Sequence, residues 1–500
     1  MSILSVGYLA MVFTGILLFY LLPQKAKPYL ILALSLIYVY TVSKFGIIFI
    51  VLTSLMVYMS ALGMKKTGDA KSRKRILSLS VSLTVAVLIV LKYLVVLPYF
   101  GKTITFDNVN MPLGMFMTNF LYPAGLSYYT LQLISYLMDV YWGKIEAESS
   151  YGKVLIFTCY FPQMVQGPIS KYSELAPEIF KEHRFEWKNL KFGTQLILWG
   201  MFKKFIIADR IGVFVSKIFY SGEAPYGLTV WVGLVYFGIQ LYCDFGGGID
   251  IIRGVSECFG IGMKENFRQP YFSRSLGEFW RRWHISLGEW MKDYVFYPVS
   301  ISRPLRKIKK SLKKVMSRKA ATRVGMGIAD LIVFILVGVW HGTGTNFFGW
   351  GLYNGIILAV SAILAEEYKK WKTGLKIKEE SLVWKGFTWI RTLIIITVGW
   401  IFDCADTLKG SLRLLINSFN FKAPNLDLLF GKTHTNFIIV LIGCIVLLVV
   451  SILREKGKDV RVLLDKQNYV VQLLVWTVVL QVIFALGYMA TDGGFMYANF

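Results

Sequence analysis

The stretch Gln269-Pro-Tyr-Phe-Ser-Arg-Ser-Leu-Gly-Glu-Phe-Trp-Arg-Arg-Trp-His-Ile-Ser-Leu287 places three arginines, a glutamate and a histidine among aromatic side chains. A long apolar run farther along the chain ends in Gly338-Val-Trp-His-Gly-Thr-Gly-Thr-Asn-Phe-Phe-Gly-Trp-Gly351. His284 and His341 are two of only four histidines in the chain, and both lie in its most apolar and aromatic part. Ionisable groups in such surroundings are typical of functional sites.

The composition of the whole chain indicates a membrane protein. Of its 500 residues, 55% are hydrophobic and only 17% are charged, which is more apolar surface than a water-soluble core can bury. We predict an all-α polytopic membrane protein with about 11 or 12 spanning helices of roughly 20 residues each. The apolar runs cover 3–22, 28–42, 45–63, 76–99, 112–138, 190–208, 227–248, 324–341, 345–365, 384–402, 436–453 and 470–488. The first run lacks a cleavage site and is followed at once by further spans, so we expect it to be retained.

The net charge of +25 follows the pattern of membrane topology and gives no sign of nucleic-acid binding. Its basic clusters lie between the apolar runs, at 65–75, 303–323, 369–378 and 454–461. Lysine and arginine are enriched in cytoplasmic loops, so we expect these four clusters on the cytoplasmic side and the amino terminus outside. For the largest cluster, binding of anionic lipid headgroups or of an acidic cytoplasmic partner is an alternative to a role in orientation alone.

Two segments cannot form ordinary spanning helices. Residues 157–175 contain Pro162, Gly167 and Pro168 within seven residues. Because non-helical backbone at membrane depth must be buried in protein or face water, this pattern predicts a re-entrant or interfacial loop. Residues 269–300 carry too many charges for lipid, which predicts an interfacial helix or a protein-enclosed re-entrant helix pair.

Asp244 and Asp250 lie in an apolar run and should have partners. An acid at membrane depth costs about 2.5–3.5 kcal/mol on insertion scales. The available cations are Arg268, Arg274, Arg281 and Arg282. The five cysteines have no CxxC spacing, so we predict neither disulfides nor a metal site.

His341 ends an apolar run and precedes a Gly-Thr-Gly-Thr-Asn break. Burial disfavours the imidazolium, so we expect a neutral imidazole that accepts a proton, as a general base does. The residues alone leave a structural role open, in which Gly338 and Gly342 let two helices approach and His341 only bonds across them. His284 borders the charged face of a short helix, and a hydrogen-bonded core role stays open for it as well.

Seven motifs follow one another between about residues 110 and 355. They are Pro123-Ala-Gly-Leu-Ser-Tyr-Tyr-Thr-Leu-Gln-Leu-Ile-Ser-Tyr-Leu-Met-Asp139, Phe161-Pro-Gln-Met-Val-Gln-Gly-Pro-Ile169, Phe202-Lys-Lys-Phe-Ile-Ile-Ala-Asp209, Gln240-Leu-Tyr-Cys-Asp-Phe245, Glu265-Asn-Phe-Arg-Gln-Pro-Tyr271, Phe279-Trp-Arg-Arg-Trp-His-Ile-Ser-Leu287 and Trp340-His-Gly342. In these motifs the chain resembles the membrane-bound O-acyltransferase (MBOAT) family, and within it the bacterial alginate O-acetyltransferase branch. Residues 1–100 and 360–500 match only as hydrophobic spans.

The resemblance implies a single membrane-embedded domain over residues 1–500. Its parts would be N-terminal helices in 1–100, a catalytic core in 110–355 and C-terminal helices in 360–500. It also implies a ring of tilted helices around a central funnel or tunnel. His341 matches the family histidine near the middle of that tunnel, and His284 matches the second family position. We expect further residues to bind the donor or line the tunnel: Arg281, Arg282, Trp283, Asp244, Gln240, Trp340 and Asn346.

The implied reaction is transfer of an acyl group, which we expect to be acetyl, from a cytoplasmic thioester to an extracytoplasmic hydroxyl. The product would be an O-acetylated cell-wall polymer or exopolysaccharide. The expected donor is acetyl-CoA or an acylated carrier protein, with no bound cofactor. Arg281, Arg282 and the basic loop 303–323 suit such an anionic donor. The expected partners are the lipid membrane, this donor and an extracytoplasmic acetyltransferase or polysaccharide, and the expected location is the bacterial inner membrane.

Three other functions stay open. D-alanyl transfer to teichoic acids uses the same fold with a different acyl group and a carrier-protein donor. A small-anion transporter or flippase, or a scaffold for polysaccharide export, would need no acyl chemistry. The chain also departs from the family pattern, because Asp244-Phe-Gly-Gly-Gly-Ile-Asp250 lacks the serine hydroxyls that relatives carry there. This difference argues against a catalytic part for that loop.

Overall fold

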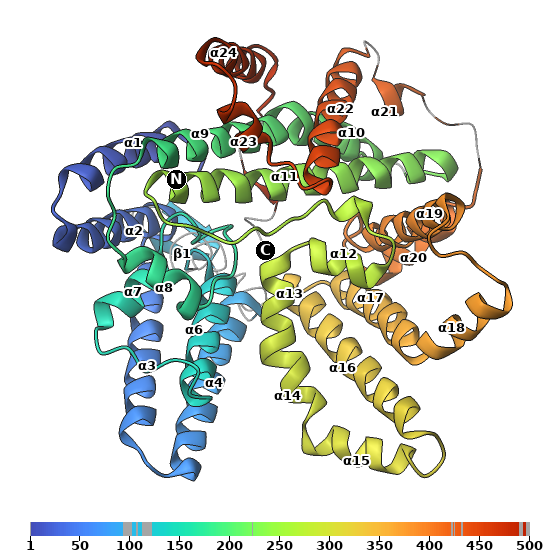
Figure 1. The fold of residues 1–500 in the computed structure, drawn as a ribbon, viewed down its shortest axis with the longest axis horizontal. Coiled ribbons are helices and arrows are strands. Elements are labelled where there is room, and N and C mark those ends of the chain that lie inside the picture. Colours follow the sequence, from blue (N-terminus) through green and yellow to red (C-terminus); the bar gives the residue numbers. More distant parts are fainter. Residues whose placement is uncertain are drawn as a thin grey trace. The chain divides into compact units, whose positions relative to one another are not determined.

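The computed structural model describes residues 2–93, 103–106, 109–112, 123–222, 224–421, 424, 426–431, 434–489 and 494–496. Helices make up almost all of this part of the chain (Figure 1). One antiparallel hairpin, β1 (Thr103–Phe106) with β2 (Val109–Pro112), follows the fourth apolar run. Residues 113–122 of the fifth apolar run lie outside the described residues, as do parts of 403–435 and of the carboxyl-terminal tail.

The chain divides into two compact units. The first holds residues 1–199, 248–264 and 492–499, and the second holds 200–247, 265–491 and residue 500. The long helices α9 (Trp187–Met201) and α11 (Gly227–Cys258) contribute residues to both. These units differ from the predicted ranges 1–100, 110–355 and 360–500, and the single functional domain stays a prediction.

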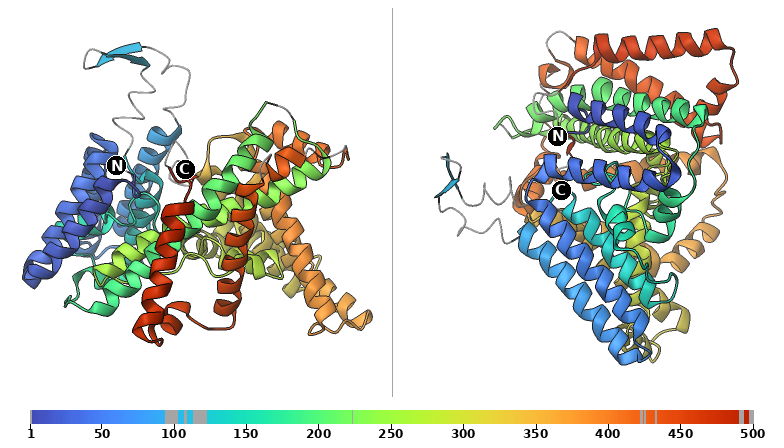
Figure 2. Two further views of the ribbon diagram at one scale, coloured as in Figure 1. Left: turned by 90° about the horizontal axis from the view of Figure 1, so that it is seen from above. Right: turned by 90° about the vertical axis from the view of Figure 1, so that its left-hand side faces the viewer.

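In the first unit the helices precede and follow the hairpin. They are α1 (Val6–Leu21), η1 (Gln24–Ala26), α2 (Lys27–Ser43), α3 (Gly46–Lys66), α4 (Ala70–Tyr93), α6 (Leu126–Tyr141), α7 (Tyr151–Cys159) and α8 (Tyr172–Phe180). Figure 2 shows α3 and α4 side by side as an antiparallel pair.

In the second unit short helices alternate with long apolar ones. They are the π-helix η5 (Phe202–Ala208), α10 (Asp209–Phe219), η6 (Pro270–Phe272), α12 (Leu276–Arg282), α13 (Ile285–Met291), the π-helix η7 (Lys292–Phe296), α14 (Tyr297–Ser300), α15 (Arg303–Leu312), α16 (Arg318–His341), α17 (Thr345–Ile363), α18 (Ala365–Gly374), α19 (Leu382–Gly399), η8 (Trp400–Phe402), α20 (Leu408–Asn417), α21 (Leu426–Phe430), α22 (Thr435–Glu455), α23 (Val460–Asp465) and α24 (Tyr469–Leu486).

The all-α polytopic fold predicted from the composition is confirmed. Within the described residues, nine helices are long and apolar enough to cross a membrane: 24–43, 46–66, 70–92, 227–258, 318–341, 345–363, 382–402, 435–455 and 469–486. This number is lower than the 11 or 12 that we predict, for three local reasons. Helix α1 has only 16 residues, α9 gives way to a π-helix after Met201, and α6 has 16 residues and follows the part of the fifth run, 113–122, that lies outside the described residues.

The predicted break in residues 157–175 is confirmed. Helix α7 ends at Cys159, α8 begins at Tyr172, and nearly all of the non-helical residues between them are buried. Gly125 adopts a left-handed φ of 65°, and a Cβ there would lie 1.8 Å from the carbonyl oxygen of Met164. Only glycine permits this approach, so the irregular backbone is enclosed by protein.

The charged stretch 269–300 forms several short helices and no continuous span. Helices α12 and α13 have seven residues each and are separated by Trp283 and His284. Ser275 begins α12, where its side chain accepts a hydrogen bond from the backbone N–H of Glu278. Two short helices therefore meet at a break that holds His284.

Helices α16 and α17 form a tightly packed antiparallel hairpin (Figure 1). Ser317 caps the start of α16 through a hydrogen bond from Ala320 N–H, and residues 342–344 connect the two helices. A Cβ on Gly351 would lie 2.5 Å from the carbonyl oxygen of Phe334. The glycines therefore let two backbones touch, as small residues do between membrane helices.

A buried ion cluster joins η5, α10 and α11. The Nζ atom of Lys204 lies 2.8 Å from Asp209 Oδ1 and 2.7 Å from Asp244 Oδ1. The three side chains are only 3%, 8% and 2% exposed. Burial alone would lower the pKa of Lys204, but the two carboxylates raise it above its ordinary value, so the lysine stays protonated.

The sequence-based expectation for the partners of the two acids is wrong. Asp244 pairs with Lys204, and Asp250 pairs with Arg253 at 3.6 Å, so neither uses the four arginines at 268–282. The π-helix places Lys204 opposite Asp244 although forty positions separate them in the chain. Arg253 is one helical turn from Asp250 and satisfies it locally.

Replacing Gly351 with alanine should loosen the α16–α17 hairpin. The new methyl group meets backbone atoms of Phe334 and Ile335, which cannot rotate away. We expect a loss of about 1–3 kcal/mol of stability, the usual cost of overpacking, measured as a lower Tm in detergent. Gly386→Ala in α19 is the matched control, since nothing lies within 4 Å of its Cβ position. Equal Tm values for the two variants would contradict the packing described.

Replacing Lys204 with methionine should be far more damaging than removing an exposed lysine. The substitution leaves two buried carboxylates without their cation, which costs about 3–5 kcal/mol for a broken buried pair. Lys181→Met is the control, because its pair with Glu178 is half-exposed and contributes little. Thermal unfolding of both variants in detergent provides the measurement, and a Lys204→Met protein as stable as Lys181→Met would exclude this role.

Candidate active site

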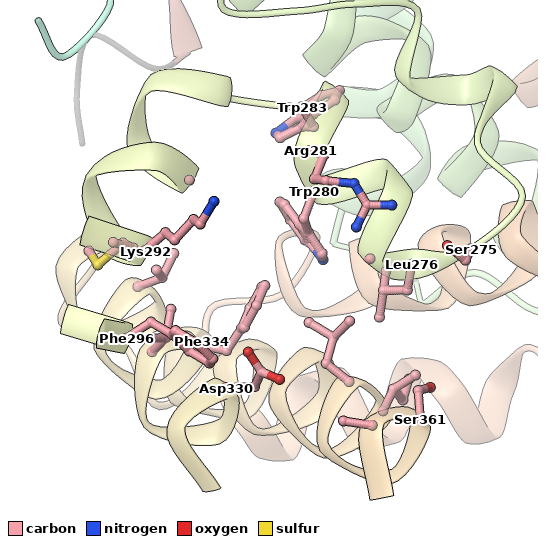
Figure 3. Close-up of a pocket in the computed structure, with 18 of the residues that line it drawn as sticks. Ser275, Leu276, Trp280, Arg281, Trp283, Lys292, Phe296, Asp330, Phe334 and Ser361 are labelled. Atoms are coloured by element: carbon pink, nitrogen blue, oxygen red, sulfur yellow. The ribbon is translucent and has the colours of Figure 1, made fainter. Parts of the chain in front are cut away.

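His284 and His341 line one cavity of the second unit, although they are far apart in the sequence. The cavity has a volume of about 1140 Å³ and is bounded by α12, α13, η7, α16, α17 and α19. Its walls are mainly apolar and aromatic, and Trp280, Trp283 and Phe334 contribute to them (Figure 3). A mainly apolar cavity with a few polar groups is the usual form of a small-molecule site.

One face of α16 forms a long wall of the cavity. Asp330, Val333, Phe334, Val337 and His341 all line it, at the spacing of one helical face. His341 follows Asp330 by eleven positions, which corresponds to three turns and a rise of about 16 Å. The cavity thus extends along α16 from a carboxylate in the middle of the helix to the histidine at its end.

His341 is buried in an aromatic surrounding. Its side chain belongs to a residue that is 7% exposed, and its ring centroid lies 5.0 Å from that of Trp340 and 5.6 Å from that of Trp350. Helix α16 ends here, and Gly342 N–H donates to Gly338 O. The break after the histidine lets the chain turn back into α17 while His341 stays beside the cavity.

His284 is held at the break between α12 and α13 in a left-handed conformation, with φ of 48°. Neighbouring backbone fixes it on both sides, because Arg268 N–H donates to Arg282 O and Ile285 N–H donates to Asn266 O. The residue is 3% exposed, and burial lowers the pKa of its imidazole to about 3. His284 is therefore a neutral imidazole at physiological pH.

The side chain of Asn266 contacts His284 directly. Its Nδ2 lies 3.3 Å from His284 Nδ1, and its Oδ1 accepts hydrogen bonds from Ser286 N–H at 3.0 Å and Ser286 Oγ–H at 2.8 Å. The ring of Phe245 packs edge-on against His284 with centroids 4.9 Å apart. These contacts fix both the position and the orientation of the imidazole.

Three cations line the cavity, namely Arg281, Lys292 and Arg391. Arg281 and Lys292 lie on opposite sides of it (Figure 3). Arg282 has a different position, since its guanidinium binds both oxygens of Glu455 at 2.7 and 3.0 Å and lies 2.9 Å from Glu278. It lines a separate charged cleft of about 770 Å³, to which Arg281 also contributes.

Four of the residues expected from the sequence line the cavity: His284, His341, Arg281 and Trp283. The other expected residues lie in the second unit but do not line the cavity. Trp340 packs between the histidines, with its ring centroid 6.4 Å from that of His284. Asn346 donates from Nδ2 to Phe402 O at 3.0 Å. Gln240 lies against Gly212, and Asp244 belongs to the ion cluster with Lys204.

Sequence reasoning assigned no role to Asn266, Lys292 or Asp330. A signal existed for Asp330, because it is the lone carboxylate in the apolar run 324–341, where an acid usually has a function. Asn266 lies in the motif Glu265–Tyr271, but its contact with His284 depends on pairing between two segments of backbone. None of the ten cations of 303–323 lines the cavity.

The chain matches known proteins over the region that holds this site. The model of the MBOAT family, the membrane-bound O-acyltransferase family, matches residues 147–398. A probable alginate O-acetylase AlgI of Pseudomonas syringae pv. tomato is 29% identical over 305 residues, which cover 61% of this chain and 53% of that protein. The peptidoglycan O-acetyltransferase of Helicobacter pylori is 29% identical over 320 residues, or 59% of this chain and 56% of that protein.

The teichoic acid D-alanyltransferase of Bacillus subtilis is 29% identical over 256 residues, or 50% of this chain and 61% of that protein. Each of these matches spans less than two thirds of the relative's length. The family match covers half of the present chain and includes both histidines and the whole cavity. On this sequence match, together with its helical membrane fold, the chain belongs to the membrane-bound O-acyltransferase family.

Proposed function

We propose that this protein transfers an acetyl group from a cytoplasmic thioester to a hydroxyl of an extracytoplasmic polysaccharide. The observation that supports this function best is the presence of two buried histidines on one cavity of a family of O-acyltransferases. His341 is the general base. The aromatic walls keep water away from the thioester, which would otherwise be hydrolysed.

The step needs one proton acceptor and no external reagent. His341 takes the proton of the acceptor hydroxyl as that oxygen attacks the thioester carbonyl carbon, and the π electrons of the carbonyl move to its oxygen. The tetrahedral intermediate then re-forms the carbonyl and expels the thiolate, which receives the proton from His341. A carbon–oxygen bond replaces a carbon–sulfur bond, and the enzyme returns to its starting state. A positioned base contributes about 10²- to 10⁴-fold to such a step.

The cavity supports a donor with a long arm and phosphate groups. Its volume of about 1140 Å³ far exceeds that of an acetyl group. Acetyl-CoA and acylated carrier proteins both present their thioester on a phosphopantetheine arm. Arg281, Lys292 and Arg391 suit the phosphate, since guanidinium and ammonium groups form charge-assisted hydrogen bonds with phosphate oxygens. The donor site therefore centres on these three cations and not on Arg282 or the segment 303–323.

The names of the relatives support a cell-envelope or secreted polymer as the acceptor. Two of them are named for O-acetylation of alginate or peptidoglycan and one for D-alanylation of teichoic acid. We propose acetylation of an envelope or secreted polysaccharide at the bacterial inner membrane, with an extracytoplasmic acetyltransferase as partner. D-alanyl transfer is the alternative that the third relative favours.

Replacing His341 with alanine should abolish ester formation. We expect the loss of at least 10²-fold in rate that follows removal of a general base. Cells carrying wild-type or His341→Ala protein at equal membrane abundance are compared, and mild alkali releases ester-bound groups from envelope and secreted polysaccharide for mass spectrometry. Loss of acetate supports the proposal, and loss of alanine in its place assigns the protein to teichoic acid modification.

The same comparison tests the functions without acyl chemistry. An unchanged content of every ester in the His341→Ala cells would reject the proposed enzyme. A transporter or flippase would then be the better explanation, because transport of a small anion needs no base at this position. His341→Gln, which conserves size and hydrogen bonding, serves as the second variant where alanine lowers the amount of folded protein.

Replacing Arg281 with glutamine should raise the KM for the donor several-fold and leave kcat nearly unchanged. Such a pattern follows when a group binds ground state and transition state equally. The assay uses inside-out membrane vesicles with acetyl-CoA as the supplied donor. The triple variant K310Q/K313Q/K314Q is the control, because none of these residues lines the cavity. An increase of KM in the control with none in R281Q would move the donor site to the basic segment.

A further inference from the structure

The hydrogen bonds around Asn266 determine which atom of its side-chain amide faces His284. Ser286 N–H lies 3.0 Å from Asn266 Oδ1. A backbone amide only donates, so the atom that it contacts must be the carbonyl oxygen of the side chain. Ser286 Oγ adds a second hydrogen bond to the same oxygen at 2.8 Å. The NH₂ group of Asn266 therefore faces the other way, toward His284.

The orientation of Asn266 in turn determines the tautomer of His284. Asn266 Nδ2 lies 3.3 Å from His284 Nδ1, and an amide nitrogen only donates. Nδ1 must therefore be the accepting nitrogen. Burial keeps the imidazole neutral, as described above, and a neutral imidazole carries one proton. That proton lies on Nε2.

His284 lines the cavity and Asn266 does not. Asn266 contacts Nδ1, so Nε2 is the ring nitrogen that a group bound in the cavity would approach, and Nε2 is itself buried. The left-handed backbone of His284 is unusual for a residue with a side chain. Strained backbone of this kind often occurs where a site needs one particular orientation.

We propose that His284 Nε2–H donates a hydrogen bond to the thioester carbonyl oxygen and that Asn266 holds it in the tautomer that does so. This inference rests on the proposed function. As the acceptor oxygen attacks, negative charge develops on the carbonyl oxygen, and the Nε2–H stabilises that charge until the thiolate leaves. His284 gains and loses no proton. The two histidines thus have opposite roles, since His341 accepts a proton while His284 only donates a hydrogen bond.

The decisive variant is Asn266→Asp, which is nearly isosteric. One carboxylate oxygen still accepts from Ser286, but the other now accepts a hydrogen bond where the amide donated one. Nδ1 of His284 must then carry the proton, and Nε2 becomes an acceptor. We expect the rate of ester formation to fall by about 10²- to 10³-fold, as on removal of one oxyanion-hole donor. The rate is measured as initial accumulation of ester-bound acetyl groups per mole of protein in the membrane.

The tautomer itself is observed by nuclear magnetic resonance of protein labelled with ¹⁵N-histidine. The chain has four histidines, so the difference between wild type and His284→Gln assigns the signal of His284. We expect a protonated Nε2 and an unprotonated Nδ1 in the wild type, and the reverse in Asn266→Asp. This readout does not depend on activity, and a purely structural role of Asn266 would not move the proton.

A second pair of variants separates a hydrogen-bond donor from a base. His284→Gln retains an N–H near the position of Nε2, whereas His284→Leu has none. Both side chains are unbranched at Cβ, so the left-handed backbone conformation disfavours the two residues to a similar extent. We expect His284→Gln to retain activity within about tenfold of wild type and His284→Leu to lose about 10²- to 10³-fold. Equal loss in both variants would reject the donor role.

The failure of this inference is distinguishable from the failure of the proposed function. If His341→Ala keeps its esters, the proposed function fails and the inference fails with it. If His341→Ala is inactive while Asn266→Asp retains wild-type rate with the inverted tautomer, only the role of His284 is rejected. Circular dichroism and size-exclusion chromatography of each purified variant establish that it is folded.

Discussion

The lack of water at membrane depth is the constraint on which this structure depends. A buried polar group there must find its partner within the protein, because an unpaired one costs several kcal/mol. Within the described residues, three buried polar features are paired or enclosed in this way. Lys204 lies between Asp209 and Asp244, the non-helical segment between α7 and α8 is enclosed, and the Asn266 side chain bonds Ser286 and His284. Each of these solutions fixes a piece of irregular backbone or a charged side chain in one position.

The candidate site combines a rigid wall with a locally broken one. Helix α16 packs backbone to backbone against α17 and presents Asp330, Phe334 and His341 along one face of the cavity. Opposite it, two seven-residue helices meet at His284, whose backbone no regular helix could provide. A long helix places side chains at regular intervals along one face, whereas a break between two helices can orient one side chain, here that of His284. In the mechanism that we propose, a base on the first and a hydrogen-bond donor on the second divide the work of acyl transfer.

The cavity combines imidazoles in aromatic surroundings with charged side chains. Aromatic rings pack against both imidazoles, and the burial of His284 keeps it neutral. The cations Arg281 and Lys292 line the cavity from α12 and η7. Arg282, one position from Arg281, is neutralised by two glutamates in another cleft. The two adjacent arginines therefore differ in their partners. Arg282 binds two glutamates, whereas Arg281 lines the cavity as well as the cleft.

The sequence by itself determined the class of fold and the pair of histidines. Apolar length and charge composition require a helical membrane protein, and proline and charge interrupt the helices at 157–175 and 269–300 whatever surrounds them. Only the tertiary structure decided the partners. Lys204 reaches Asp244 through a π-helix, Asn266 reaches His284 through paired backbone, and Arg253 replaces the arginines expected for Asp250. Helix length and composition are local properties of the chain, whereas an ion pair or a tautomer depends on atoms that distant segments bring within about 3 Å of one another.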